Sequence, residues 1–162
     1  MEKGFYHVPQ AINEPIKGYA PGSAERAEVQ AAYDKMWNET LNIPMVINGK
    51  RIETGKTMRV LPPHDHQHNV GSFHFGEAKH VHEAIQASLD AKEAWENMSW
   101  ANRSAIFLKA ADLVAGPYRA RINAATMIQQ SKTIFQAEID SACELADFLR
   151  FNVQYATEIY AE

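Results

Sequence analysis

Residues 134–162 predict one long helix that must be buried on more than one side. Apolar residues recur there at alternating spacings of four and three, the period of a single helix face: Phe135, Ile139, Ala142, Ala146, Leu149, Val153, Ala156 and Tyr160. A second apolar row follows another side of the same helix: Phe148, Phe151, Tyr155 and Ile159. The rest of the chain offers only shorter helices and hairpins to cover these rows, so we expect further polypeptide after Glu162.

Shorter helices are expected before this long one. Ser23 and Ser99 are favoured N-cap residues, and Gly116-Pro117 is a strong helix break. Together with the helical spacing of apolar residues, these signals predict four helical segments: 26–41, 76–95, the stretch between Ser99 and Gly116, and 118–130.

Four short strands are expected in the first half of the chain. Asn48-Gly49 lies between apolar runs and is a strong hairpin signal, because both residues accept a positive φ. The expected strands form two pairs, the second joined by a polar loop over 62–68: 45–47 with 50–53, and 58–61 with 70–75. The sequence itself therefore predicts a mainly α-helical segment with N-terminal β-hairpins.

The first 22 residues differ from the rest in their proline content. Pro9, Pro15 and Pro21 each remove a backbone donor and disfavour helix before them. We expect an extended arm that wraps over the rest of the chain, in preference to a frayed tail. The predicted organisation is an arm, residues 1–22, and a folded unit, residues 23–162.

Charge and cysteine content exclude some partners and compartments. The chain has 16 basic and 20 acidic residues, a formal net charge of -4 and no long block of either sign, so we expect no nucleic-acid surface. Apolar runs are too short for a membrane span, and residues 1–7 do not resemble a secretion signal. A single cysteine favours a reducing compartment. We expect a cytoplasmic protein, or one of the mitochondrial matrix if the source is eukaryotic.

The histidine-rich stretch from His64 to His68 is the first candidate site. His64, His66 and His68 could share a metal only if this stretch were extended with all three rings on one face, and no cysteine lies nearby. We therefore expect a solvated loop and no metal site.

Residues 138–147 concentrate acidic side chains around the only thiol. Cys143 lies mid-helix among apolar neighbours, which favours a small core residue over a nucleophile. Glu138, Asp140 and Asp147 have the spacing of a solvated helix face. Glu144 differs because apolar neighbours crowd it, and a carboxylate in that setting needs a cationic partner or a ligand. Glycine-rich phosphate loops and the Gly-x-Ser-x-Gly nucleophile motif are absent from the sequence, so motifs alone predict no catalytic or cofactor-binding residue.

Several continuous motifs resemble the aldehyde dehydrogenase superfamily. The run Ser104-Ala105-Ile106-Phe107-Leu108-Lys109-Ala110-Ala111-Asp112-Leu113 is similar to a family helix, and 126–140 is similar to the turn and acidic helix that follow it. Ser131 stands where the family usually has glycine in that turn. Further motifs resemble the pyrroline-5-carboxylate dehydrogenase branch: Asn13-Glu14-Pro15, Gln136-Ala137-Glu138-Ile139-Asp140, Glu144-Leu145, Asp147-Phe148 and Arg150-Phe151-Asn152.

The resemblance implies a fold and an activity for a longer enzyme. The implied fold is α/β, with a Rossmann-like NAD domain to which residues 23–162 contribute an N-terminal part that is incomplete at its C-terminal end. The implied activity is oxidation of L-glutamate γ-semialdehyde to L-glutamate with NAD, in proline catabolism, by a homo-oligomer. The catalytic cysteine and the NAD-binding residues lie in the family's later sequence. This segment alone is therefore expected to be inactive, and its partners are the remainder of the dehydrogenase chain and the aldehyde.

The resemblance assigns one site residue. In the family, the helix that corresponds to 144–152 borders the tunnel through which the aldehyde enters, so Glu144 is expected to contact substrate without acting as the catalytic base. The alternative is a freestanding, non-enzymatic helical module that acts by self-association or partner binding through its exposed apolar stripe.

Overall fold

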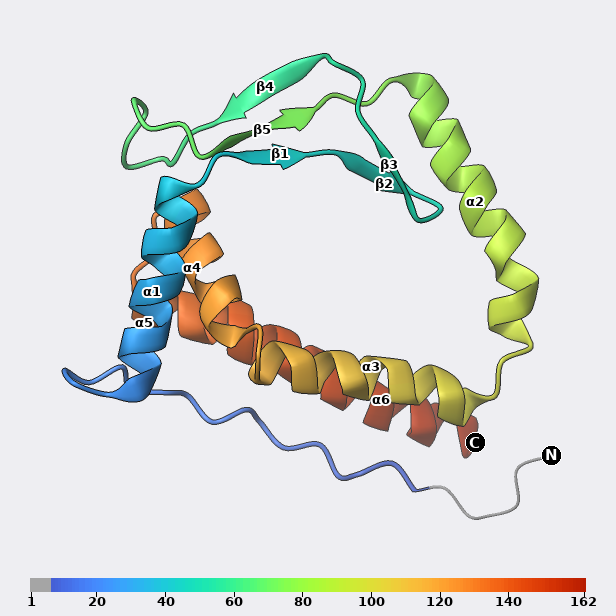
Figure 1. The fold of residues 1–162 in the computed structure, drawn as a ribbon. Coiled ribbons are helices and arrows are strands. Elements are labelled where there is room, and N and C mark those ends of the chain that lie inside the picture. The colour runs from blue at the N-terminus through green and yellow to red at the C-terminus, as the bar shows by residue number, and fades with distance from the viewer. Residues whose placement is uncertain (1–6) are drawn as a thin grey trace.

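The computed structural model describes residues 7–162 and places short strands at one end of a group of helices (Figure 1). The helices are α1 (Ala24–Asn38), α2 (Ala78–Glu96), α3 (Trp100–Ala115), α4 (Arg119–Gln130), α5 (Ile134–Ala137), the π-helix η1 (Glu138–Cys143) and α6 (Glu144–Tyr160). The strands are β1 (Leu41–Ile43), β2 (Met45–Ile47), β3 (Lys50–Ile52), β4 (Thr57–Val60) and β5 (Gly71–His74). The expected mainly helical segment with N-terminal hairpins is confirmed.

The local signals place most element boundaries as expected. The side chain of Ser23 accepts a hydrogen bond from the backbone N–H of Arg26, and Ser99 accepts one from Asn102, so both serve as N-caps. Asn48 and Gly49 join β2 to β3 with positive φ angles of 50° and 73°. The predicted second strand pair is also present, as antiparallel β4 and β5.

Strand β1 was not expected, because the sequence predicted that the first helix continues to residue 41. The helix ends at Asn38, and β1 pairs in parallel with β5 in a sheet of order β1-β5-β4. The strands approach closely at Gly71, where an added Cβ would lie 2.5 Å from the carbonyl oxygen of Leu41. Pairing with residues 30 positions later therefore overrides the local helical preference at Leu41.

The predicted continuous helix over 134–162 is interrupted by η1. Buried residues in this region lie five positions apart, Ala137 with Ala142 and Glu138 with Cys143, which matches the i to i+5 hydrogen-bond spacing of a π-helix. The expected stripe is therefore wrong at its start: Phe135 is 63% exposed, whereas Glu138 is completely buried. Further along, the first expected row holds at Ala146 and Val153, which are buried. The second row is largely exposed within residues 7–162, since Phe148, Tyr155 and Ile159 are at least 50% exposed.

The arm crosses below the helices, where α3 and α6 pack side by side (Figure 1). Residues 7–20 form neither helix nor strand, and a turn at 21–22 leads into α1. Residues 1–6 of the predicted arm lie outside the described residues. The arm thus lies on the side of the molecule away from the sheet, and it contacts η1 and α6 there (Figure 1).

Candidate functional site: a clamped arm and the cavity beside it

Three backbone N–H groups of the arm bind side chains of the C-terminal helices. The N–H of Ala11 donates to Gln154 (2.8 Å), that of Glu14 to Asp147 (2.6 Å) and that of Lys17 to Glu138 (2.8 Å). The three donors are three residues apart, which is the period of a polyproline II helix. Because residues 7–20 form neither helix nor strand, these N–H groups are free to bind side-chain acceptors, which hold the arm along its length.

A buried ion pair lies beneath the arm. The Arg119 guanidinium donates to both carboxylate oxygens of Glu138 and also to the carboxylate of Glu14 and the carbonyl oxygen of Pro15. Arg150 donates to the second oxygen of Glu14 at 2.6 Å. Only 4% of the Arg119 side chain and none of the Glu138 side chain is exposed.

The remaining polar atoms around Glu138 are also paired. The hydroxyl of Tyr19 donates to Glu138 at 2.7 Å, and the Asn123 amide donates to it at 2.8 Å. Within residues 7–162, every buried side-chain nitrogen and oxygen atom has a hydrogen-bond partner. Burial of such a network is tolerable because each member is satisfied.

These contacts move the pKa of the buried groups. Burial alone would raise the pKa of Glu138, but hydrogen bonds from Arg119, Lys17 N–H, Tyr19 and Asn123 outweigh it and hold this pKa at about 2. Burial and the nearby Glu138 carboxylate raise the pKa of the Tyr19 hydroxyl. Glu138 is therefore a carboxylate, and Tyr19 a neutral hydrogen-bond donor, at neutral pH.

Cys143 is a buried core residue, as expected. Burial, followed by the negative charge of Glu138, raises its pKa to about 11. Its sulfur lies 3.4 Å from the Arg119 guanidinium and 3.7 Å from Glu138. A thiol with this pKa is almost entirely protonated at neutral pH, so Cys143 is a poor nucleophile.

A cavity of about 730 Å³ lies between the arm and the helix formed by η1 and α6. The arm contributes three residues: Asn13, Glu14 and Ile16. The helix contributes the others: Ile139, Asp140, Cys143, Glu144, Asp147, Phe148, Phe151, Asn152 and Tyr155. The cavity therefore combines aromatic and aliphatic surface with several carboxylates.

Glu144 lines this cavity, but not in the crowded setting expected from its sequence neighbours. Its side chain is exposed, and its carboxylate takes part in none of the hydrogen bonds or ion pairs within residues 7–162. The buried carboxylate of this region is instead Glu138, six residues earlier, and its cationic partner is Arg119. Asp147 was expected on a solvated face, yet it binds Asn13 (2.8 Å) and the N–H of Glu14.

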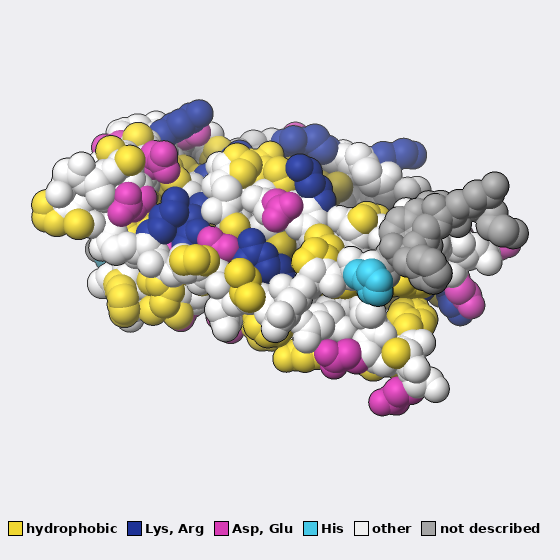
Figure 2. All heavy atoms as spheres, turned by 90° about the horizontal axis from the view of Figure 1, so that it is seen from below, with side chains coloured by type: hydrophobic (Ala, Val, Ile, Leu, Met, Phe, Trp, Pro, Cys, Tyr) yellow, Lys and Arg dark blue, Asp and Glu magenta, His cyan; other side chains and the backbone are white. Residues whose placement is uncertain are grey.

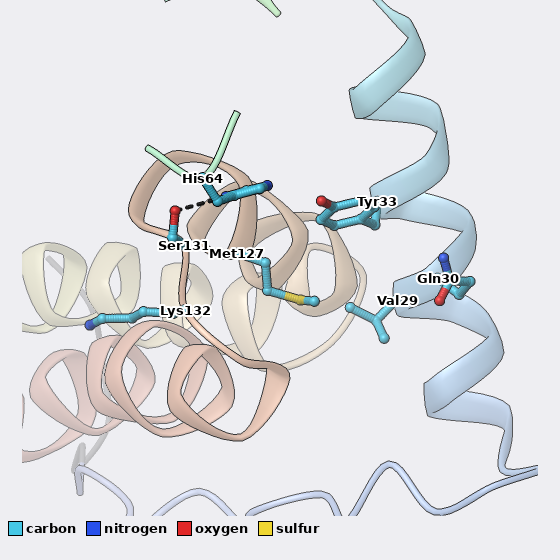
Figure 3. A pocket seen from close by; sticks show the side chains of 7 residues that line it. All are labelled: Val29, Gln30, Tyr33, His64, Met127, Ser131 and Lys132. Carbon is cyan, nitrogen blue, oxygen red and sulfur yellow. Dashed lines mark hydrogen bonds between the residues drawn. The ribbon is translucent and has the colours of Figure 1, made fainter. Parts of the chain in front are cut away.

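The histidine-rich loop packs against the end of α1. The ring of His68 stacks on Trp37 with a centroid distance of 4.1 Å, and its Nε2 donates to the Trp37 carbonyl at 2.7 Å. His64 shares a 2.7 Å hydrogen bond with Ser131 at the edge of a second cavity of about 400 Å³ (Figure 3). Across residues 7–162, no three His, Cys, Asp or Glu residues are grouped closely enough to hold a metal ion.

Ser131 adopts the left-handed conformation that favours glycine. Its φ is 55° and its ψ is 30°, and it directly follows the last residue of α4. The turn thus has a backbone conformation that favours glycine, the residue usual at this position in the family, although Ser131 carries a side chain.

The surface crossed by the arm mixes acidic, basic and hydrophobic side chains (Figure 2). Elsewhere several large apolar residues are more than 50% exposed, among them Val81, Ile85 and Leu89 of α2. In the described part of the chain, each helix is too short or too polar to span a bilayer.

Comparison with known proteins confirms the resemblance. Residues 51–162 match the model of the aldehyde dehydrogenase family. The chain is 47% identical over 158 residues to delta-1-pyrroline-5-carboxylate dehydrogenase of Agaricus bisporus, which covers 97% of this chain and 29% of that protein. It is 46% identical over 157 residues to the probable delta-1-pyrroline-5-carboxylate dehydrogenase of Schizosaccharomyces pombe, covering 96% and 29%. The chain therefore spans less than a third of the length of these relatives.

Solved structures agree with the sequence comparison. The delta-pyrroline-5-carboxylate dehydrogenase of Mycobacterium tuberculosis, bound with NAD and cobalamin, superimposes with a TM-score of 0.97 at 37% identity, over 100% of this chain and 31% of that chain. The same enzyme bound with NAD gives a TM-score of 0.94 at 38% identity, over 98% and 30%. Residues 51–162, more than half of this chain, match the family model, and the chain therefore belongs to the aldehyde dehydrogenase family.

Proposed function

We propose that this chain forms the N-terminal part of an enzyme that oxidises L-glutamate γ-semialdehyde to L-glutamate with NAD, as a step of proline catabolism. The observation that carries the proposal is the 47% identity, over 97% of the chain, to a delta-1-pyrroline-5-carboxylate dehydrogenase. The likeness to the NAD-bound enzyme of Mycobacterium tuberculosis supports the choice of cofactor.

In this proposal the described residues supply a wall of the aldehyde site and leave the covalent chemistry to other polypeptide. The buried, protonated Cys143 is unsuited to attack an aldehyde. The thiolate and the residues that hold NAD would lie in the part of the relatives that this chain does not span. The buried pair of Arg119 and Glu138 holds the arm, which lines the same cavity as Glu144.

The proposal is tested on the native gene product, captured from its source cells with an antibody raised against this chain. We expect an intact mass more than three times the 18.2 kDa of this chain, and reduction of NAD when glutamate semialdehyde is added. Its native mass then reports whether it is a homo-oligomer. A native product of 18.2 kDa without activity would favour the alternative of a freestanding binding module.

The names of the relatives support a proposal for the cellular compartment. The delta-1-pyrroline-5-carboxylate dehydrogenases of Dictyostelium discoideum and Bos taurus are named as mitochondrial. We therefore extend the proposal to the mitochondrial matrix if the source is eukaryotic, and fractionation of the source cells tests it.

Within the proposed enzyme, Glu144 contacts the aldehyde substrate without acting as the catalytic base. Support comes from its exposed carboxylate in the 730 Å³ cavity, beside the aromatic rings of Phe148 and Phe151. The rings offer apolar surface to a carbon chain, while the carboxylate offers a hydrogen-bond acceptor.

Replacing Glu144 with alanine in the complete enzyme tests this role. We expect kcat/KM for glutamate semialdehyde to fall about tenfold or more, because a hydrogen bond to a charged group contributes about 1.5–3 kcal/mol. Glu83→Ala is the matched control, since Glu83 is an exposed glutamate on α2, outside the cavity. Unchanged kcat and KM in Glu144→Ala would show that Glu144 does not contact the substrate.

A further inference from the structure

The arm forms one wall of the cavity that contains Glu144, and Ile16 is its apolar member. We infer that Ile16 is a specificity-determining residue that packs against the carbon chain of the aldehyde. This inference rests on the proposed function, because it assigns a ligand to the same cavity.

The backbone around Ile16 is fixed on both sides. The residue before it, Pro15, accepts a 2.7 Å hydrogen bond from Arg119, and the residue after it, Lys17, donates one of 2.8 Å to Glu138. Both partners belong to the buried ion pair, whose atoms are held by several contacts each. Ile16 therefore occupies a defined position in the wall although it belongs to a segment without helix or strand.

The side chain itself is free to contact a ligand. Within residues 7–162, Ile16 is 56% exposed, so the hydrogen bonds that fix its neighbours leave much of its apolar surface uncovered by this part of the chain. A ligand that covers this surface gains the free energy of apolar burial. The same cavity presents Ile139, Phe148 and Phe151, so the class of ligand that fits has an aliphatic chain next to its polar groups.

Arg119 acts here as a positioning residue. It does not line the cavity, but it holds Glu14 and Pro15, directly before Ile16, through its guanidinium. Ile16 is the residue that contacts the carbon chain, and the ion pair of Arg119 with Glu138 fixes the position of Ile16.

Ile16→Trp in the complete enzyme tests the inference, with Ile12→Trp as a matched control. Ile12 lies on the same arm and is 68% exposed, but it is not among the residues that line the cavity. We expect Ile16→Trp to raise KM for glutamate semialdehyde about tenfold, because the larger side chain takes up ligand volume, while KM for NAD stays within about twofold. Ile12→Trp should leave both constants within about twofold of the wild type.

If the tryptophan variant does not fold, Ile16→Ala is measured instead, because shortening an exposed side chain disturbs the fold less. We expect it to raise KM for the semialdehyde about threefold through lost apolar contact. An unchanged KM in the Ile16 variants, or an equal rise in Ile12→Trp, would overturn the inference while the wild-type enzyme remains active. A wild-type enzyme that does not oxidise glutamate semialdehyde would instead overturn the proposed function.

Discussion

Replacing Arg119 with methionine is expected to lower the free energy of unfolding by about 3–5 kcal/mol, because the fully buried Glu138 carboxylate loses its cationic partner. Methionine fills much of the same volume, so the loss reports the unpaired charge and not a cavity. The same change also frees Glu14 and Pro15 of the arm. Denaturant unfolding followed by circular dichroism measures the difference.

Arg121→Met is the matched control for this prediction. Arg121 lies on the same helix, α4, two positions later, and its side chain is exposed. Removing an exposed charge without a buried partner should change the free energy of unfolding by no more than about 0.5 kcal/mol. Equal effects of the two substitutions would mean that the buried pair does not stabilise the fold.

Acid is expected to destabilise the folded chain through Glu138. Its pKa in the folded chain, about 2, lies below the 4.5 of an ordinary glutamate, so the unfolded chain takes up the proton first. The stabilisation is fully present above about pH 5 and is lost as the pH falls toward 2. The shift corresponds to about 3 kcal/mol. Free energies of unfolding measured between pH 6 and pH 2 check this expectation.

Glu138→Gln isolates the contribution of this one group from that of the other carboxylates. The variant keeps a hydrogen-bond acceptor for Tyr19 and Asn123 but cannot titrate. The free energy of unfolding should therefore fall less for this variant than for the wild type between pH 5 and pH 2. The difference between the two falls should be about 3 kcal/mol. Parallel pH curves for the two proteins would assign the acid sensitivity to other groups.

Features that depend on neighbouring residues were predictable from the sequence. Ser23 and Ser99 begin helices, and Asn48-Gly49 forms a hairpin, because each signal acts within about four residues. Strand β1 was missed because Leu41 joins the sheet only through its pairing with Gly71, far along the chain.

The buried ion pair could not be predicted from helical periodicity. The expected stripe assumed 3.6 residues per turn, and one π-helical turn at η1 moves Glu138 into the core and Phe135 out of it. A partial signal was present, because Arg119 lies in the first turn of α4, where the helix dipole disfavours a cation unless an acidic partner is near.

The candidate cavity was predictable only in part. The resemblance predicted that Glu144 borders the substrate site, and Glu144 does line the cavity. The crowded setting predicted from its sequence neighbours is wrong, because its side chain is exposed. The arm side of the cavity depends on contacts such as that between Glu14 and Arg119, which are 105 positions apart. No local pattern reports such a contact.

The anchoring of the arm also sets an order of events during synthesis. Ala11 and its partner Gln154 are 143 positions apart, so at ~5–20 residues per second Gln154 is added roughly 7–30 s after Ala11. Loop closure and helix formation take far less than a millisecond. The arm therefore cannot dock until its partner residues on η1 and α6 have been synthesised, and its backbone N–H groups stay without these partners until then.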